Sequence, residues 1–126
     1  MGMLDGFSPF NFEEGVPYVS VTINGVTFNK SVVMKLDYPA HALLLINEAD
    51  KKIAVQACDE ATQNATPFYK EKKSGAISVR WNGRDLLNTF QDIMGWKLKN
   101  EAYRIEGIHL KEERAILFDL TQATPL

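Results

Sequence analysis

The chain has 126 residues, of which 45% are hydrophobic, so it can bury one core but is too short for two domains of ordinary size. Its formal net charge of -2 and isoelectric point near 5.7 exclude a global electrostatic attraction to nucleic acid or to an anionic membrane, so any such binding must be local. The single cysteine, Cys58, cannot form an intramolecular disulfide, and no apolar run of about 18 residues occurs. We therefore expect a cytoplasmic protein without a membrane partner.

Residues 1–17 show neither a helical nor an alternating pattern and are predicted to form an irregular N-terminal arm. Phe7, Phe10 and Phe12 lie in this arm among glycine, proline and acidic residues. We expect the aromatic side chains to dock the arm onto the body of the protein. The alternative is an exposed aromatic peptide that captures a partner, because terminal segments fray unless they are pinned.

Residues 18–58 form the first of two similar units. It opens with two β-prone runs, residues 18–23 and 26–28, which flank the dipeptide Asn24-Gly25. Because this dipeptide favours the tight turn that matches the twist of paired strands, the sequence predicts a β-hairpin here.

A short helix and a second hairpin complete this unit. Asn29 is placed to cap the helix, and Pro39 prevents the helix from continuing. Residues 42–46 and 53–57 are β-prone and are joined by a polar turn, so they are predicted to pair. The apolar face of the helix consists of Val32, Val33 and Leu36.

A polar connector, residues 59–75, leads to the second unit, residues 76–120. This unit starts with a predicted strand at residues 76–81, followed by Asn82 as the candidate helix cap. The helix is about one turn longer than that of the first unit and is expected to stop at Gly95. Its apolar stripe consists of Leu86, Leu87, Phe90, Ile93 and Met94.

The second unit also ends in a hairpin. An alternating strand contains Tyr103 and Ile105, a polar turn follows at residues 111–113, and the closing strand covers residues 115–120. The tail, residues 121–126, is predicted to be loose.

The two units repeat the same order of elements. Asn29 recurs as Asn82 at a shift of 53 positions, and Ile53 recurs as Ile116 at a shift of 63 positions. The difference is taken up by the longer second helix and its connector. A duplicated unit of strands and one short helix predicts an α+β fold, mainly β, in one compact domain, because one unit alone has too few strands to cover its apolar faces.

This pattern resembles the swapped-hairpin family of the AbrB, MazE and MraZ proteins. The residues that carry the resemblance are 24–30 with Val33 and Leu36, and 44–46 with 53–55. The resemblance implies two repeats that interlock into one small pseudo-twofold barrel, as a monomer with a pseudo-dimeric core, or as a homodimer if the units swap between chains. It also implies a role in binding double-stranded DNA.

Basic residues are concentrated near the start of the second unit. Lys70, Lys72, Lys73, Arg80 and Arg84 are accompanied by a single acid between residues 70 and 84. These cations are suited to neutralising DNA phosphates, with arginine forks available for guanine edges.

The first unit supplies only Lys30 where AbrB-like proteins carry arginines, so the resemblance assigns DNA contact mainly to the second unit. The alternative reading of the basic cluster is a solvated connector followed by the water-facing positions of one strand.

No motif for catalysis or for a cofactor was found. The sequence has no Gly-rich phosphate loop and no Gly-x-Ser-x-Gly elbow, and its two histidines, His41 and His109, lack the spacing of a metal site. We therefore expect no enzymatic activity, no metal and no cofactor.

Two functions follow from these patterns. The first is a DNA-binding transcriptional regulator or antitoxin-like protein that uses Arg80, Arg84, Lys70, Lys72 and Lys73, with Lys30 as a weaker contact. The second is a protein-interaction or scaffold module on the same fold, which would use the aromatic arm and the acidic first half of the chain.

Overall fold

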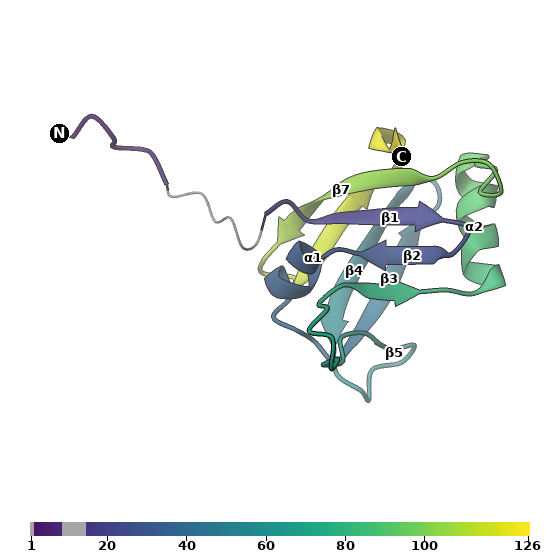
Figure 1. The fold of residues 1–126 in the computed structure, drawn as a ribbon, viewed down its shortest axis with the longest axis horizontal. Helices are drawn as coiled ribbons and strands as arrows, with labels where there is room; N and C mark the ends of the chain where they lie inside the picture. Colours follow the sequence, from purple (N-terminus) through teal and green to yellow (C-terminus); the bar gives the residue numbers. More distant parts are fainter. Residues whose placement is uncertain (1, 9–14) are drawn as a thin grey trace.

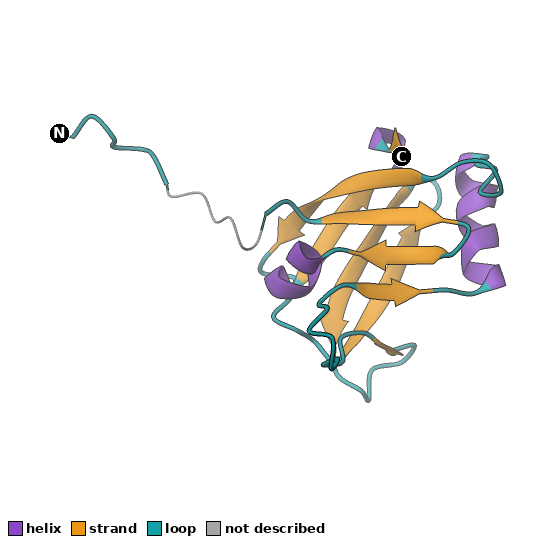
Figure 2. Cartoon of the chain, viewed as in Figure 1, coloured by secondary structure: helices purple, strands orange, loops and turns teal. Residues whose placement is uncertain are grey.

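The computed structural model describes residues 2–8 and 15–126 of the chain. Within them it is mainly β with two α-helices, as the sequence predicts (Figures 1 and 2). The elements of the first unit are β1 (Tyr18–Thr22), β2 (Gly25–Phe28), α1 (Lys30–Lys35), β3 (His41–Asn47) and β4 (Lys52–Cys58). The following elements are β5 (Thr66–Pro67), β6 (Val79–Trp81), α2 (Arg84–Met94), β7 (Tyr103–Leu110), β8 (Ala115–Asp119), the 3-10 helix η1 (Leu120–Gln122) and β9 (Thr124–Pro125).

All strand pairs are antiparallel and belong to one curled sheet. The strand order is β5-β3-β4-β8-β7-β1-β2-β6, with β9 attached to β7. The sheet folds over into a half-barrel with two layers (Figure 1). We call β6, β2, β1, β9 and the first half of β7 the front layer, and β5, β3, β4, β8 and the second half of β7 the back layer. The helix α2 stands across one end of the front strands, and α1 lies at the other end.

Alternation along the strands builds the core between the two layers. In the front layer Val19 and Val21 alternate with outward-facing polar residues, and in the back layer Ile53 and Val55 alternate with the outward-facing Lys52, Ala54 and Gln56. Each of the four core side chains is at most 1% exposed. Because successive side chains of a strand point to opposite faces, the positions between them are left on the outer surface.

The strand β7 passes from one layer to the other at Gly107. Residues 103–106 pair with β1, and residues 107–110 pair with β8. A Cβ atom on Gly107 would lie 2.5 Å from Cγ2 of Ile116 and 2.7 Å from Cε1 of Phe118. Phe118 lies opposite Gly107 in the ladder between β7 and β8, and the two side chains of β8 approach the backbone so closely that only glycine fits at this bend without rearrangement.

The sheet does not close into a full barrel, because β5 and β6 at its two ends do not pair. The indole Nε1 of Trp81 donates a hydrogen bond of 2.8 Å to the carbonyl of Pro67 and so connects the two edges. The rings of Phe28, Phe68 and Trp81 lie 5.2 to 5.5 Å apart and fill the space beneath this bond. Contacts between aromatic side chains thus take the place of backbone hydrogen bonds between β5 and β6.

The strand predicted at residues 76–81 is shorter than expected and covers only Val79–Trp81. Its only partner, β2, has four residues, so only the three residues in register with it form the ladder. The Nζ of Lys72 donates to the carbonyl of Ser78 at 3.0 Å, just before the strand begins.

The helix ends confirm two predictions and overturn a third. Asn29 caps α1 by accepting a hydrogen bond from the amide of Val32, and Gly95 ends α2 in the left-handed conformation. Asn82 does not cap α2, because the N-cap position is occupied by Gly83, which makes no side-chain hydrogen bond. With a φ of 150°, Gly83 provides a backbone turn between β6 and the helix that a residue with a side chain rarely adopts.

The prediction of a loose tail is wrong. Residues 120–122 form η1, and β9 pairs with the start of β7, so the chain end completes the front layer. The prediction of a docked arm is not met by Phe7, which is 76% exposed. Phe10 and Phe12 lie outside the described residues. No helix in residues 2–8 or 15–126 is long and apolar enough to cross a membrane.

Candidate nucleic-acid interface

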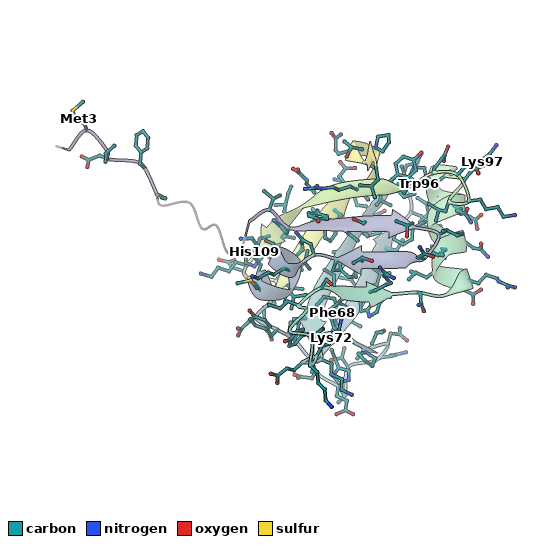
Figure 3. All side chains as sticks on the ribbon, in the orientation of Figure 1. Met3, Phe68, Lys72, Trp96, Lys97 and His109 are labelled. Atoms are coloured by element: carbon teal, nitrogen blue, oxygen red, sulfur yellow. The ribbon has the colours of Figure 1, made fainter. Side chains whose placement is uncertain are left out.

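The basic residues predicted to bind DNA are all exposed, but the fold distributes them over several places. Arg80 lies in the middle of β6, and Arg84 begins α2. Lys30 begins α1, at the opposite end of the paired strands β2 and β6. The remaining three, Lys70, Lys72 and Lys73, lie in the loop between β5 and β6, and Figure 3 shows Lys72 at the lower end of the molecule.

Arg80 belongs to a row of residues that runs across four strands of the front layer. It lies opposite Thr27 on β2, Thr27 lies opposite Ser20 on β1, and Ser20 lies opposite Arg104 on β7. Their strand neighbours are buried in the core or packed against it, so these four side chains face outward. Three strand spacings of about 4.8 Å place the Cα atoms of the two arginines roughly 14 Å apart.

Both arginines are held against the surface of the sheet. The Nε of Arg80 donates a hydrogen bond of 3.1 Å to Oγ1 of Thr27. The Cζ of Arg104 lies 3.8 Å from the centre of the Tyr18 ring, which is a cation–π contact. Neither contact includes a hydrogen bond from the terminal Nη groups, which are the usual donors to phosphate.

Charge is segregated by layer and not by repeat. The segments that build the front layer and its helices, residues 15–36 and 68–106, contain ten Lys and Arg against five Asp and Glu. The segments that build the back layer and its turns, residues 37–67 and 107–126, contain four against eight. The fold therefore places β1 and β2, which come from the acidic half of the sequence, in the basic layer.

A groove runs beside α2. It has a volume of about 580 Å³ and lies between the polar face of the helix, the turn after β1 and the segment that follows the helix. The lining residues are Ile23, Arg84, Asn88, Gln91, Lys97, Lys99 and Asn100. Three of them are cations and three are carboxamides, and none is acidic, so the groove presents donors to an anion.

Sequence reasoning found Arg80 and Arg84 but missed Arg104, Lys97 and Lys99. The alternating pattern of β7 indicates that Arg104 faces away from the core, but only the pairing of β1 with β7 brings it into line with Arg80. The one local signal for the groove is the spacing of Arg84, Asn88 and Gln91 at i, i+4 and i+7, which places them on one face of α2.

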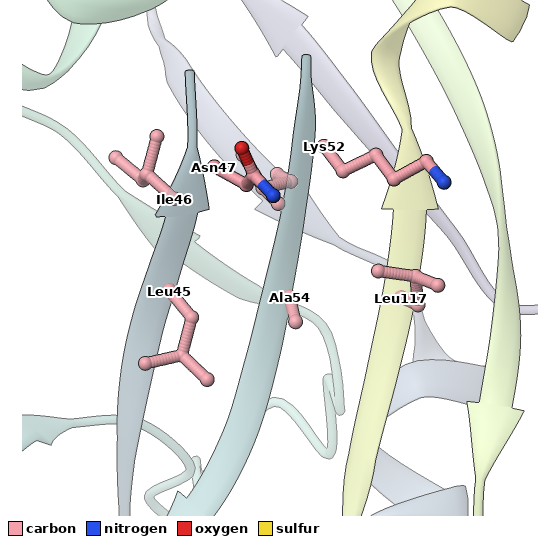
Figure 4. Close-up of a pocket in the computed structure, with 7 residues that line it drawn as sticks. Leu45, Ile46, Asn47, Lys52, Ala54 and Leu117 are labelled. Carbon is pink, nitrogen blue, oxygen red and sulfur yellow. The ribbon is translucent and has the colours of Figure 1, made fainter. Parts of the chain in front are cut away.

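The outer face of the back layer has a different character. Leu45, Ala54 and Leu117 lie side by side on β3, β4 and β8 and line a shallow hollow of about 180 Å³ (Figure 4). Leu45 is 43% exposed, and Ile108, opposite Leu117 on β7, is 62% exposed. This surface is apolar, so it offers an anion little beyond Lys52 and Asn47 at its edge.

In the part of the chain that the structure describes, two groups have displaced pKa values, and neither is one of the basic side chains described above. Burial raises the pKa of Tyr103, as do a hydrogen bond and the charge of Glu101. Hydrogen bonds from the side chain and backbone of Thr121 lower the pKa of Asp119, with a smaller contribution from Lys52, against the opposing effect of desolvation. Among residues 2–8 and 15–126, no three His, Cys, Asp or Glu side chains cluster in a way that would hold a metal ion.

Comparison with known proteins found no matching family model, no matching curated protein and no matching solved structure.

Proposed function

We propose that this protein binds double-stranded DNA through the outer surface of its front layer, as a small regulator or antitoxin-like protein. The observation that carries the proposal is the segregation of charge, with ten basic and five acidic residues in the segments of the front layer and its helices. A local excess of cations provides phosphate binding that the net charge of -2 would otherwise disfavour.

The arginine row matches the dimensions of DNA. The Cα atoms of Arg80 and Arg104 are roughly 14 Å apart, and the major groove is about 12 Å wide. The backbone positions of the two arginines are therefore spaced so that their flexible side chains can reach phosphates on opposite sides of the groove. The hydroxyls of Ser20 and Thr27 lie between them and are able to hydrogen-bond to DNA.

We further propose that the two repeats interlock as in the swapped-hairpin family. Two strand pairings support this. Thr27 lies opposite Arg80, its counterpart at the shift of 53 positions, and Ala54 lies opposite Leu117, its counterpart at the shift of 63 positions. Equivalent residues meet in this way when an approximate twofold axis passes between the paired strands. DNA binding by that family then gives the front-layer proposal an independent basis.

The test is a fluorescence anisotropy titration with a labelled duplex of random sequence at about 50 and about 200 mM salt. Each phosphate contact contributes about -0.9 to the slope of log K against log salt. The double variant Arg80→Gln/Arg104→Gln should therefore flatten the slope by about 2. The matched control, Lys111→Gln/Arg114→Gln, removes the same charge from the turn between β7 and β8 in the back layer.

Three results would contradict the proposal. One is the absence of salt-dependent binding by the wild-type protein. Another is a loss in the control variant as large as that in the front-layer variant. The third is an unchanged slope in the Arg80→Gln/Arg104→Gln variant. Circular dichroism and thermal unfolding of each variant verify that any loss of binding does not come from loss of the fold.

A further inference from the structure

We infer that the groove beside α2 is a binding site for a nucleotide, with its cations holding the phosphate. The groove is separate from the arginine row, since neither Arg80 nor Arg104 lines it. Its volume of about 580 Å³ falls within the range of small-molecule sites. That volume is far larger than a single phosphate ion requires, so the site is suited to an organic phosphate.

The cations of the groove have no partners of their own. The side chains of Arg84, Lys97 and Lys99 form no hydrogen bond or ion pair with any residue that the structure describes. Glu101, the acid next to this segment, is engaged elsewhere, because its Oε1 accepts from the backbone amide of Lys97 and its carboxylate bonds to Tyr103. An anion entering the groove therefore does not have to displace an internal carboxylate.

The two lysines lie on a segment that is firmly held. Leu98, between them, is 2% exposed, and its backbone amide donates to Oε1 of Gln91 at 3.0 Å. Trp96 stacks on Tyr103 with ring centres 4.2 Å apart and anchors the preceding turn. Figure 3 shows Trp96 and Lys97 beside the upper end of α2. The lysines are thus presented by a fixed backbone, which lowers the entropic cost of binding.

The remaining lining residues are suited to the rest of a nucleotide. The Nε2 of Gln91 donates to Oδ1 of Asn88 at 3.3 Å, which orients the Asn88 carboxamide and leaves its Nδ2 as a donor. Asn100 supplies a second carboxamide, and carboxamides pair well with base edges. Ile23 is 53% exposed at the edge of the groove and offers an apolar surface to a base or sugar.

The spacing of the cations indicates how the ligand lies. Arg84 is seven residues before Gln91 on α2, which corresponds to about 10 Å along the helix axis. The lysines lie beyond the helix C-terminus, so the positive charges stand at both ends of the groove, with the carboxamides of Asn88 and Gln91 between them. A phosphate at one end and a base over the carboxamides fit this arrangement, and a strand with a second phosphate would engage both ends.

The test is two-dimensional NMR of the ¹⁵N-labelled full chain titrated with AMP, with adenosine and inorganic phosphate as separate probes. We expect AMP to shift the side-chain amide signals of Asn88 and Asn100 in a saturable manner. Adenosine, which lacks the phosphate, should bind at least about tenfold more weakly. Inorganic phosphate should shift the same signals but with lower affinity than AMP.

The variant Arg84→Gln/Lys99→Gln should weaken AMP binding by at least about tenfold, since it removes two charge-assisted contacts. The Lys111→Gln/Arg114→Gln variant is the control and should bind AMP like the wild-type protein. An absence of saturable shifts, equal binding of adenosine and AMP, or an unchanged affinity in the groove variant would overturn the inference.

A third titration distinguishes the source of the phosphate. A 5′-phosphorylated trinucleotide that binds at least about tenfold tighter than AMP would assign the site to a nucleic-acid strand, whereas equal affinity would assign it to a free nucleotide. Both results support the groove as a nucleotide site. The outcome is independent of the duplex titration, because Arg80 and Arg104 lie outside the groove.

Discussion

Replacing Gly107 with alanine should destabilise the protein by about 1–3 kcal/mol, the usual cost of overpacking a core. The added Cβ would lie 2.5 Å from Cγ2 of Ile116 and 2.7 Å from Cε1 of Phe118, and both side chains are fully buried. Carbon atoms in contact are normally about 3.5–4.0 Å apart, so the strands must separate by about an ångström or the core must repack. The loss of stability would arise at the bend where β7 passes from one layer to the other.

Urea denaturation followed by tryptophan fluorescence measures this cost, and each 1 kcal/mol should also lower Tm by roughly 3–5 °C in a domain of this size. Phe118→Leu removes ring atoms that the new Cβ would meet. In that background the alanine at position 107 should cost about 1 kcal/mol less, which a double-mutant cycle detects. Gly2→Ala is the control, because its new Cβ meets only the exposed side chain of Asp5.

The reasoning would be refuted if Gly107→Ala unfolded within about 0.5 kcal/mol of the wild-type protein, since that is the range of neutral surface substitutions. It would also be refuted if the costs of the Gly107 and Phe118 substitutions were simply additive, because residues that clash must be coupled.

Three further predictions concern single hydrogen-bonding groups. Trp81→Phe keeps an aromatic ring but removes the bond to Pro67, and urea denaturation should show a loss of about 1 kcal/mol. Asn29→Ala removes the cap, the bond accepted from the amide of Tyr18 and the bond donated to the carbonyl of Val16, and the same assay should show a loss of about 1–2 kcal/mol. Thr121→Val should raise the pKa of Asp119 toward its ordinary value in an NMR titration. A lowered pKa stabilises the folded protein at pH values above the ordinary pKa of an aspartate, and this stabilisation is lost as the pH falls through the pKa of the folded state. The contribution of Asp119 to stability should therefore be smaller in the variant than in the wild-type protein.

Much of the secondary structure follows from short-range patterns. The first hairpin, the cap at Asn29 and the alternating strands were all predictable, because each depends on residues a few positions apart. The turn of the hairpin lies one residue earlier than predicted, at Ile23 and Asn24, because Gly25 pairs with Thr22. One local prediction failed at the start of the second helix. Asn82 looks like Asn29 in sequence, but the chain turns into α2 at Gly83 instead.

The prediction for the tail failed because its pairing partner is distant in the sequence. Residues 121–126 have no strong local preference, yet β9 finds an unpaired edge on β7, and the backbone amide of Leu126 donates to the carbonyl of Ala102. Strand addition at an edge depends on what the rest of the sheet leaves open, which no local pattern records.

The candidate site divides in the same way. The charge of the segment from Lys70 to Arg84 was visible in the sequence, and the outward orientation of Arg80 followed from strand alternation. The alignment of Arg104 with Arg80 was not visible, because 24 positions separate them and only the order β7-β1-β2-β6 brings them into one row.

The sequence by itself determined that the chain is mainly β with two helices, since hydrophobic periodicity, turn dipeptides and helix caps act over a few residues. Only the tertiary structure decided which strands became neighbours, and hence that β1 and β2 joined the basic layer and that Lys97 and Lys99 joined Arg84 around a groove. Pairing between distant strands depends on burying two apolar faces together, and that choice is made by the whole chain at once.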